Sequence, residues 1–228
     1  MSLRCASKCV AQLATPYIIE LVAEYVSAMQ EAEKRRFYRM LSCVPELRTA
    51  AGRVFERAVH KWLGKKIEKT LELREALGTD PDLDPIQPND RTFMIKNTID
   101  FHALRDLTLN ESGTPRVDPN MLDVYFRPIS NSLKAVDSFL LSSKHDCIIF
   151  FQATMAETHS IIADGIQDIM NILPAQFPKK GILLFIVSED CKLKTQQSYQ
   201  YNHCTRAATK DIKQRIVKVS ENTLFGPE

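Results

Sequence analysis

Two unbroken apolar runs constrain the fold of this chain more than any other feature. The first, Cys147–Met155, contains Cys-Ile-Ile-Phe-Phe, and the second, Gly181–Ser188, reads Gly-Ile-Leu-Leu-Phe-Ile-Val-Ser. Apolar runs of this length without alternation are typical of central strands that are covered on both faces of a sheet. We therefore predict that the two runs are neighbouring central strands and that neither forms a solvent-exposed edge.

The segment between the two runs predicts a helix. Apolar residues recur at helical spacing over Thr158–Leu173, and Pro174 follows directly. A helix that joins two parallel neighbours of one sheet is a common connection, and such crossovers are right-handed. The order of the elements thus predicts an α/β fold, in which helices flank both faces of a mixed β-sheet.

Further elements are predicted on either side of this unit. Helices are expected over Tyr17–Leu41 and Pro45–Leu63, strands over Leu122–Phe126 and Leu133–Leu141, an edge strand over Gln214–Val219, and turn-rich loops over Gly78–Asp90 and Asn110–Asn120. We expect an N-terminal helical extension, residues 1–44, and one domain, residues 45–228.

Cysteine usage and the missing motifs exclude several classes of protein. The six cysteines include no C-x-x-C pair, which argues against a zinc site and favours a reduced cytoplasmic or nuclear setting. No run approaches the roughly 18 apolar residues of a membrane span, and no secretory signal peptide is expected. The chain contains neither the P-loop motif of an NTPase nor the G-x-S-x-G motif of a serine hydrolase.

Three polar residues stand out within the predicted apolar elements. Glu56 lies on the second helix, Asp137 in Ala-Val-Asp-Ser-Phe, and Gln152 in Phe-Phe-Gln-Ala-Thr at the end of the first apolar run. Side-chain oxygens of this kind can hold Mg²⁺ against a scissile phosphate when they lie close together. Each also has a structural interpretation: Glu56 could pair with Arg53 or Arg57, and the other two could satisfy buried polar groups.

Four sequence blocks, in order, carry a resemblance to a known family. They are Ala51–His60 with Gly-Arg-Val-Phe-Glu, Tyr125–Phe139 with Arg-Pro and Asp-Ser-Phe, Phe151–Ser160 with Gln-Ala-Thr and a histidine, and Leu183–Ser188 with a trailing Gln196 or Gln197. This order resembles the restriction-endonuclease-like, PD-(D/E)XK-type, C-terminal domain of fungal Crinkler-type and retrotransposon-hot-spot (RHS) proteins. The resemblance implies a domain of effectors and selfish-element proteins, one that often follows an NTPase module and that acts inside a recipient cell.

The active-site signature departs from that of the family at two positions. Thr154 occupies the place of the lysine, and Gln152 is neutral. Lys134 or His159 are the candidates to supply the missing positive group. With these two candidates, the predicted catalytic set is Glu56, Asp137, Gln152, Thr154, His159 and Lys134, with Mg²⁺, if the chain is catalytic, on Glu56, Asp137 and Gln152. The matched motif order predicts that Glu56, Asp137 and Gln152 converge in space.

The charge pattern bears on the choice of function. Lys192–Lys218 contains seven lysines and arginines against one acid, a pattern that can follow a phosphate backbone or simply form a solvated face. The predicted nucleic-acid contacts are Lys192, Lys194, Arg206, Lys210, Lys213 and Arg215. The leading hypothesis is a degenerate nuclease-fold module that binds nucleic acid, a host protein or an NTPase module without efficient catalysis. The alternative is an active Mg²⁺-dependent nuclease that hydrolyses DNA or RNA.

Overall fold

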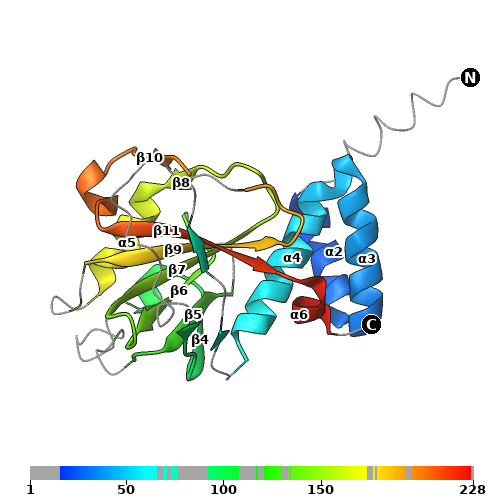
Figure 1. Cartoon of the computed structure of the whole chain (residues 1–228), viewed down its shortest axis with the longest axis horizontal. Coiled ribbons are helices and arrows are strands. Elements are labelled where there is room, and N and C mark those ends of the chain that lie inside the picture. Colours follow the sequence, from blue (N-terminus) through cyan, green and yellow to red (C-terminus); the bar gives the residue numbers. More distant parts are fainter. Residues whose placement is uncertain are drawn as a thin grey trace, which may run out of the picture. The chain divides into compact units, whose positions relative to one another are not determined.

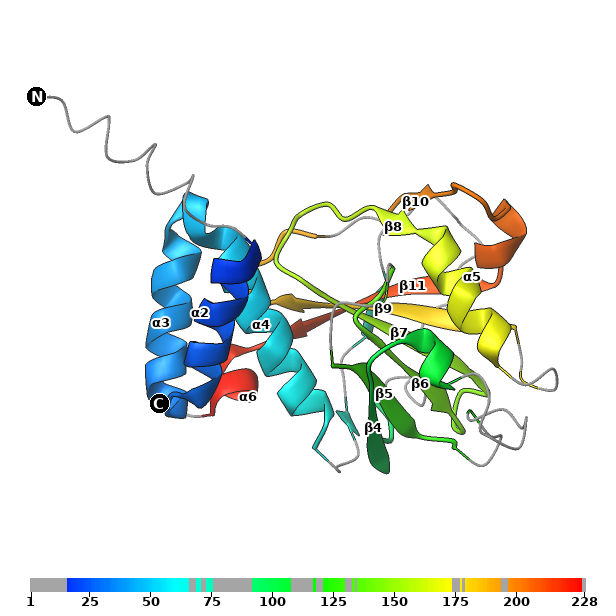
Figure 2. The ribbon, with the colours of Figure 1, turned by 180° about the vertical axis from the view of Figure 1, so that it is seen from behind.

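The computed structural model describes residues 16–65, 69–70, 73–75, 92–107, 117, 121–129, 133, 135–173, 177, 179–193 and 197–226 (Figures 1 and 2). Two compact units divide the chain: one comprises Met1–Trp62 with Val219–Glu228, and the other comprises Leu63–Lys218. The predicted boundary at residues 44 and 45 differs from this division, because the second predicted helix and the C-terminal residues belong to the first unit. Loop 78–90, Lys134, Lys194 and almost all of loop 110–120 lie outside the described residues.

The first unit is helical. It contains α2 (Pro16–Ala28), α3 (Glu31–Cys43), the 3-10 turn η1 (Pro45–Leu47), α4 (Arg48–Leu63) and α6 (Glu221–Phe225). The aromatic ring of Tyr38 joins three of these helices, since its centroid lies 6.3 Å from that of Phe55 and 5.3 Å from that of Phe225. This packing explains why the C-terminal residues belong with the N-terminal helices.

The prediction of one continuous helix over residues 17–41 is wrong. The helix is interrupted at Met29 and Gln30, where the backbone of Gln30 is extended. The Gln30 N–H donates to the Glu33 carboxylate at 3.3 Å, which caps the start of α3. Sequence periodicity continues through this break because both helices bury one face.

The second unit is built on a seven-stranded mixed sheet in the order β2-β11-β9-β7-β6-β5-β4. The strands are β2 (Leu73–Glu75), β4 (Asn97–Phe101), β5 (Val124–Pro128), β6 (Ser138–Ser142), β7 (Cys147–Thr154), β9 (Gly181–Ser188) and β11 (Ile212–Val219). Pairs β4–β5 and β7–β9 are parallel, whereas β5–β6, β6–β7 and β2–β11 are antiparallel. The predicted α/β class with a mixed sheet is therefore confirmed.

Shorter elements complete this unit. Strands β1 (Lys69–Thr70) and β3 (Thr92–Phe93) pair antiparallel, and β8 (Ile161–Ile162) and β10 (Tyr199–Gln200) pair parallel. Helix α5 (Ala163–Ile172) follows β8, and η3 (Leu104–Leu107) and η4 (Arg206–Thr209) are 3-10 turns. None of the described helices is long and apolar enough to cross a membrane.

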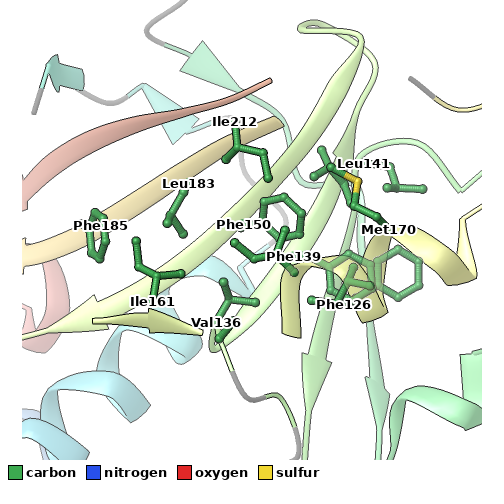
Figure 3. Close-up of a cluster of buried hydrophobic side chains, with 14 of the residues drawn as sticks. Phe126, Val136, Phe139, Leu141, Phe150, Ile161, Met170, Leu183, Phe185 and Ile212 are labelled. Atoms are coloured by element: carbon green, nitrogen blue, oxygen red, sulfur yellow. The ribbon is translucent and has the colours of Figure 1, made fainter. Parts of the chain in front are cut away.

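The two apolar runs form central neighbouring strands, as predicted. Strands β7 and β9 pair in parallel from Ile148 opposite Gly181 to Thr154 opposite Val187, and both are buried along almost their whole length. Figure 3 shows the hydrophobic cluster on one face of the sheet, in which Phe150 and Leu183 lie among side chains that include Met170 of α5. Unbroken apolar runs thus predicted strands that are covered on both faces.

Three predicted elements differ from the structure. The strand predicted as an edge, β11, lies between β2 and β9. The helix predicted from residue 158 begins only at Ala163, because Ile161 and Ile162 pair with β10. The strand predicted from residue 133 begins at Ser138. The residue before it, Asp137, turns its carboxylate to the main chain of β7.

Candidate functional site

Asp137, Gln152 and Thr154 meet at one end of the central strands. Asp137 directly precedes Ser138, which lies opposite Phe151 in the antiparallel β6–β7 pair. Gln152 and Thr154 are two residues apart near the carboxyl end of β7 and therefore project on the same face. The carboxyl ends of parallel strands in an open α/β sheet are where ligands commonly bind.

The carboxylate of Asp137 is bound by donors from β7. Gln152 Nε2 donates to Asp137 Oδ1 at 2.9 Å, and the Ala153 N–H donates to Asp137 Oδ2 at 2.5 Å. The Asp137 N–H in turn donates to the Phe151 carbonyl at 2.8 Å. The predicted approach of Asp137 and Gln152 is confirmed. Their contact is a hydrogen-bonded tie between β7 and the residue that precedes β6.

Thr154 occupies the position that the family resemblance assigns to lysine. It is buried, and its hydroxyl oxygen accepts a hydrogen bond from the Ala156 N–H at 3.1 Å. This bond closes a local turn where the chain leaves β7. Thr154 therefore brings no positive charge to the site, and its hydroxyl has a structural partner.

His159 is held beside this site by a chain of glutamine side chains. The His159 N–H donates to Gln197 Oε1 at 2.6 Å. Gln214 of β11 holds the main chain of Gln197 from both sides: the Gln197 N–H donates to Gln214 Oε1 at 2.7 Å, and Gln214 Nε2 donates to the Gln197 carbonyl at 2.9 Å. The His159 ring meets Phe185, which lies opposite Gln152 in the β7–β9 register, edge to face with centroids 6.2 Å apart.

We expect His159 to make folding stability depend on pH. Burial lowers the pKa of its half-buried ring below the ordinary value, so below about pH 6.5 the unfolded chain binds the proton more readily. Stability should be constant above that pH and should fall as the pH drops towards the lowered folded-state pKa. In His159→Phe, this fall between about pH 7 and about pH 5 should be smaller than in the wild type.

The measurement is denaturant unfolding at several pH values, with NMR titration of the His159 ring alongside. His203→Phe is the matched control, because His203 is exposed. A His159 ring that titrates at or above its ordinary pKa would contradict the prediction.

Glu56 lies on α4 in the helical unit and carries its own ion pair. Arg53 NH1 donates to Glu56 Oε2 at 2.7 Å, and His60 Nε2 lies 3.9 Å from Glu56 Oε1. Burial raises the pKa of the Glu56 carboxyl above its ordinary value, although Arg53 opposes the shift. The pairing with Arg53 agrees with the structural interpretation of Glu56, and its convergence with Asp137 and Gln152 stays a prediction.

The donor set around Asp137 does not fit a divalent cation in this arrangement. Both carboxylate oxygens accept N–H donors, and the Gln152 amide turns its nitrogen, a group that cannot bind a cation, towards them. A hard cation prefers several oxygen ligands, carboxylates above all. Among the described residues, no group of three or more His, Cys, Asp or Glu side chains could hold a metal ion.

The predicted nucleic-acid contacts separate into exposed and buried residues. Lys192, Arg206, Lys210 and Lys213 are exposed. Arg215 is a correction: it is only 6% exposed, and its guanidinium NH1 donates to the Gln214 carbonyl at 3.2 Å. It lies on β11 within the sheet and therefore cannot contribute to a surface that meets phosphates.

Two polar groups were missed in the sequence. On β11, Gln214 lies on the same face as the buried Ile212 and Ile216, so strand periodicity predicts that its side chain points inward. The other group surrounds the buried Asp123, which binds Lys96 Nζ at 2.7 Å and the hydroxyl and N–H of Ser143. Burial opposes ionisation of Asp123, but Lys96 and Ser143 outweigh it and lower the pKa of the carboxyl.

Comparison with known proteins gave no match among protein-family models, curated proteins or solved structures. The proposal for the function of this chain therefore rests on its own sequence and structure.

Proposed function

We propose that the sheet unit is a degenerate nuclease-fold module, of the kind used in Crinkler-type and RHS-type proteins, that binds nucleic acid without efficient catalysis. The observation that carries the proposal is that both oxygens of the Asp137 carboxylate accept hydrogen bonds from the protein. Its carboxylate accepts hydrogen bonds from Gln152 and the Ala153 N–H instead of facing a second acid. An Asp before one strand and a side-chain amide on its antiparallel neighbour match the layout of the nuclease signature, with neutral Gln152 and Thr154 in place of its second acid and its lysine.

The site chemistry supports binding over cleavage. Hydrolysis of a phosphodiester needs groups that stabilise the attacking hydroxide and the charge that develops on the phosphate. Thr154 is neutral and bonded within its own turn, and the pKa of the His159 imidazole is lowered by burial. Near neutral pH, neither group supplies the positive charge of a lysine. Affinity has a separate source, because exposed lysines and arginines can pair with phosphates without any catalytic group.

The proposal predicts salt-sensitive binding with little or no cutting. With four phosphate contacts, affinity for duplex DNA should fall about 10²-fold between about 50 mM and about 200 mM salt. Binding is measured by fluorescence anisotropy with DNA and RNA oligonucleotides. Cleavage is measured with plasmid DNA and RNA during a Mg²⁺ or Mn²⁺ titration of the wild type and of Asp137→Ala.

The outcomes of this experiment separate the two candidate functions. Robust Mg²⁺-dependent cutting that Asp137→Ala abolishes would replace the proposal with the active-nuclease alternative. Binding that does not respond to salt, or no binding at all, would remove the nucleic-acid function.

A further inference from the structure

Lysines gather at the sheet edge opposite the Asp137 site. This edge is formed by the β6–β7 turn and by the residues that lead into β9 and β11. The Ile148 N–H donates to the Lys180 carbonyl at 3.2 Å, and the Gly181 N–H donates to the Asp211 carbonyl at 3.0 Å. These main-chain bonds make the three segments direct neighbours. We call Lys144, Lys179, Lys180, Lys210 and Lys213 the amino-edge lysines, after the amino ends of β7 and β9.

The amino-edge lysines outnumber the acids among them. All five are exposed, and the exposed acids in the same segments are Asp146 and Asp211. Asp146 pairs with Lys180 at 3.1 Å. The nearby Asp123 carboxylate is buried and already binds Lys96, so it adds no free negative charge to the surface. The edge is therefore a net positive strip.

Two of these lysines are held by neutral acceptors. Lys179 Nζ donates to the Met170 carbonyl at 2.7 Å, near the end of α5, and Lys144 Nζ donates to the Thr92 hydroxyl. A carbonyl or a hydroxyl orients an ammonium group without cancelling its charge, and two further N–H donors of each lysine remain for a ligand. The strip thus combines fixed positions with charge that is available to an anion.

We propose that the amino-edge lysines bind the phosphate backbone of a nucleic acid strand; this inference rests on the proposed function and assigns its binding surface. The described parts of these segments, residues 143–146, 179–181 and 210–211, present no exposed apolar side chain. Binding to a lipid surface commonly adds apolar anchors to basic residues, so the composition favours a polyanion in solution.

The location explains why binding and cleavage would be uncoupled. Gln152 lies opposite Phe185, five residues beyond Lys180 along β9. At about 3.3 Å per residue, the edge and the Asp137 site are roughly 16 Å apart. A phosphate that pairs with Lys144 or Lys210 is therefore not in contact with the Asp137 carboxylate.

The test compares two matched double variants of the full chain. Lys144→Ala/Lys210→Ala removes two amino-edge charges, and Arg36→Ala/Arg48→Ala removes two exposed charges of the helical unit that belong to no predicted binding surface. Anisotropy is measured with a mixed-sequence DNA duplex from about 50 mM to about 200 mM salt. The amino-edge variant should weaken binding at least about tenfold at the lowest salt, and its slope of log K against log salt should fall by about 1.8. The control variant should change affinity less than about twofold.

Three outcomes would overturn the inference. Equal affinity of wild type and Lys144→Ala/Lys210→Ala, or an equal loss in both double variants, would exclude this edge as the binding surface while nucleic-acid binding itself stands. Binding of anionic phosphatidylserine vesicles in place of nucleic acid would assign the strip to a lipid surface. A wild type that binds no nucleic acid would remove the proposed function, and the inference with it. Circular dichroism and melting of both variants ensure that each is folded.

Discussion

The double variant Gln152→Glu/Thr154→Lys is expected to cut nucleic acid in Mg²⁺ about 10²- to 10³-fold faster than the wild-type chain. The glutamate would face Asp137, whose oxygens now accept the Gln152 amide at 2.9 Å. Two carboxylates at that separation repel each other unless a cation lies between them, so the substitution favours Mg²⁺ in the site. The lysine would supply the positive charge that Thr154 lacks.

The geometry of β7 places the lysine on the face of the site. Thr154 is the last residue of β7 and projects on the same face as Gln152. The matched control is Gln152→Glu/Thr154→Met, which has a similar stem and no charge. Single variants separate the two contributions.

The readout is nicking of supercoiled plasmid and cleavage of RNA, with melting temperatures measured with and without Mg²⁺. Mg²⁺ should raise the melting temperature of the glutamate variants and not that of the wild type. If all variants stay inactive while Mg²⁺ stabilises them, the lysine position is not catalytic in this fold. If Mg²⁺ stabilises none of the variants, the residues around Asp137 do not form a metal site even when the second acid is restored.

The central part of this fold could be predicted because local sequence pattern and tertiary burial agree there. The runs at Cys147–Met155 and Gly181–Ser188 are apolar on both faces, and burial on both faces is what the structure provides. The break between α2 and α3 could not be predicted from periodicity, since the two helices keep the same apolar spacing. It depends on the bond from Gln30 to Glu33, which is a local cap inside an otherwise helical pattern.

The candidate site could be predicted only in part. Asp137 and Gln152 stood out as polar residues within apolar strands, and antiparallel register brings them together. The direction of the Gln152 amide could not be predicted from the sequence. This direction decides whether Asp137 and Gln152 act as metal ligands or form a hydrogen bond between neighbouring strands. The position of β11 in the sheet was also not local information. A basic strand reads as an edge, but β11 pairs with β2 at Arg215 and the Arg215 side chain is buried.

Asp137→Ala is expected to lower the free energy of unfolding by about 2 to 4 kcal/mol, the second large effect. Removing the carboxylate leaves the buried Gln152 amide and the Ala153 N–H without the acceptor that now lies 2.9 Å and 2.5 Å away. Asp137→Asn should cost less, about 1 kcal/mol, because its amide oxygen still accepts one bond and Gln152 can turn to accept the other. Asp168→Ala, on the exposed side of α5, is the control and should be close to neutral.

The sign of the Asp137→Ala effect also decides what the carboxylate is for. Residues kept for catalysis are often held at a cost to stability, so their removal leaves the fold unchanged or makes it more stable. A residue kept for structure gives the opposite result. Denaturant unfolding of wild type, Asp137→Ala and Asp137→Asn distinguishes the two. A large loss in the alanine variant with partial recovery in the asparagine variant is the result expected of a degenerate site, because the carboxylate then serves as the acceptor that fixes the end of β7. A more stable alanine variant would mean that Asp137 is held ready for a ligand, and it would favour the active nuclease over the degenerate module.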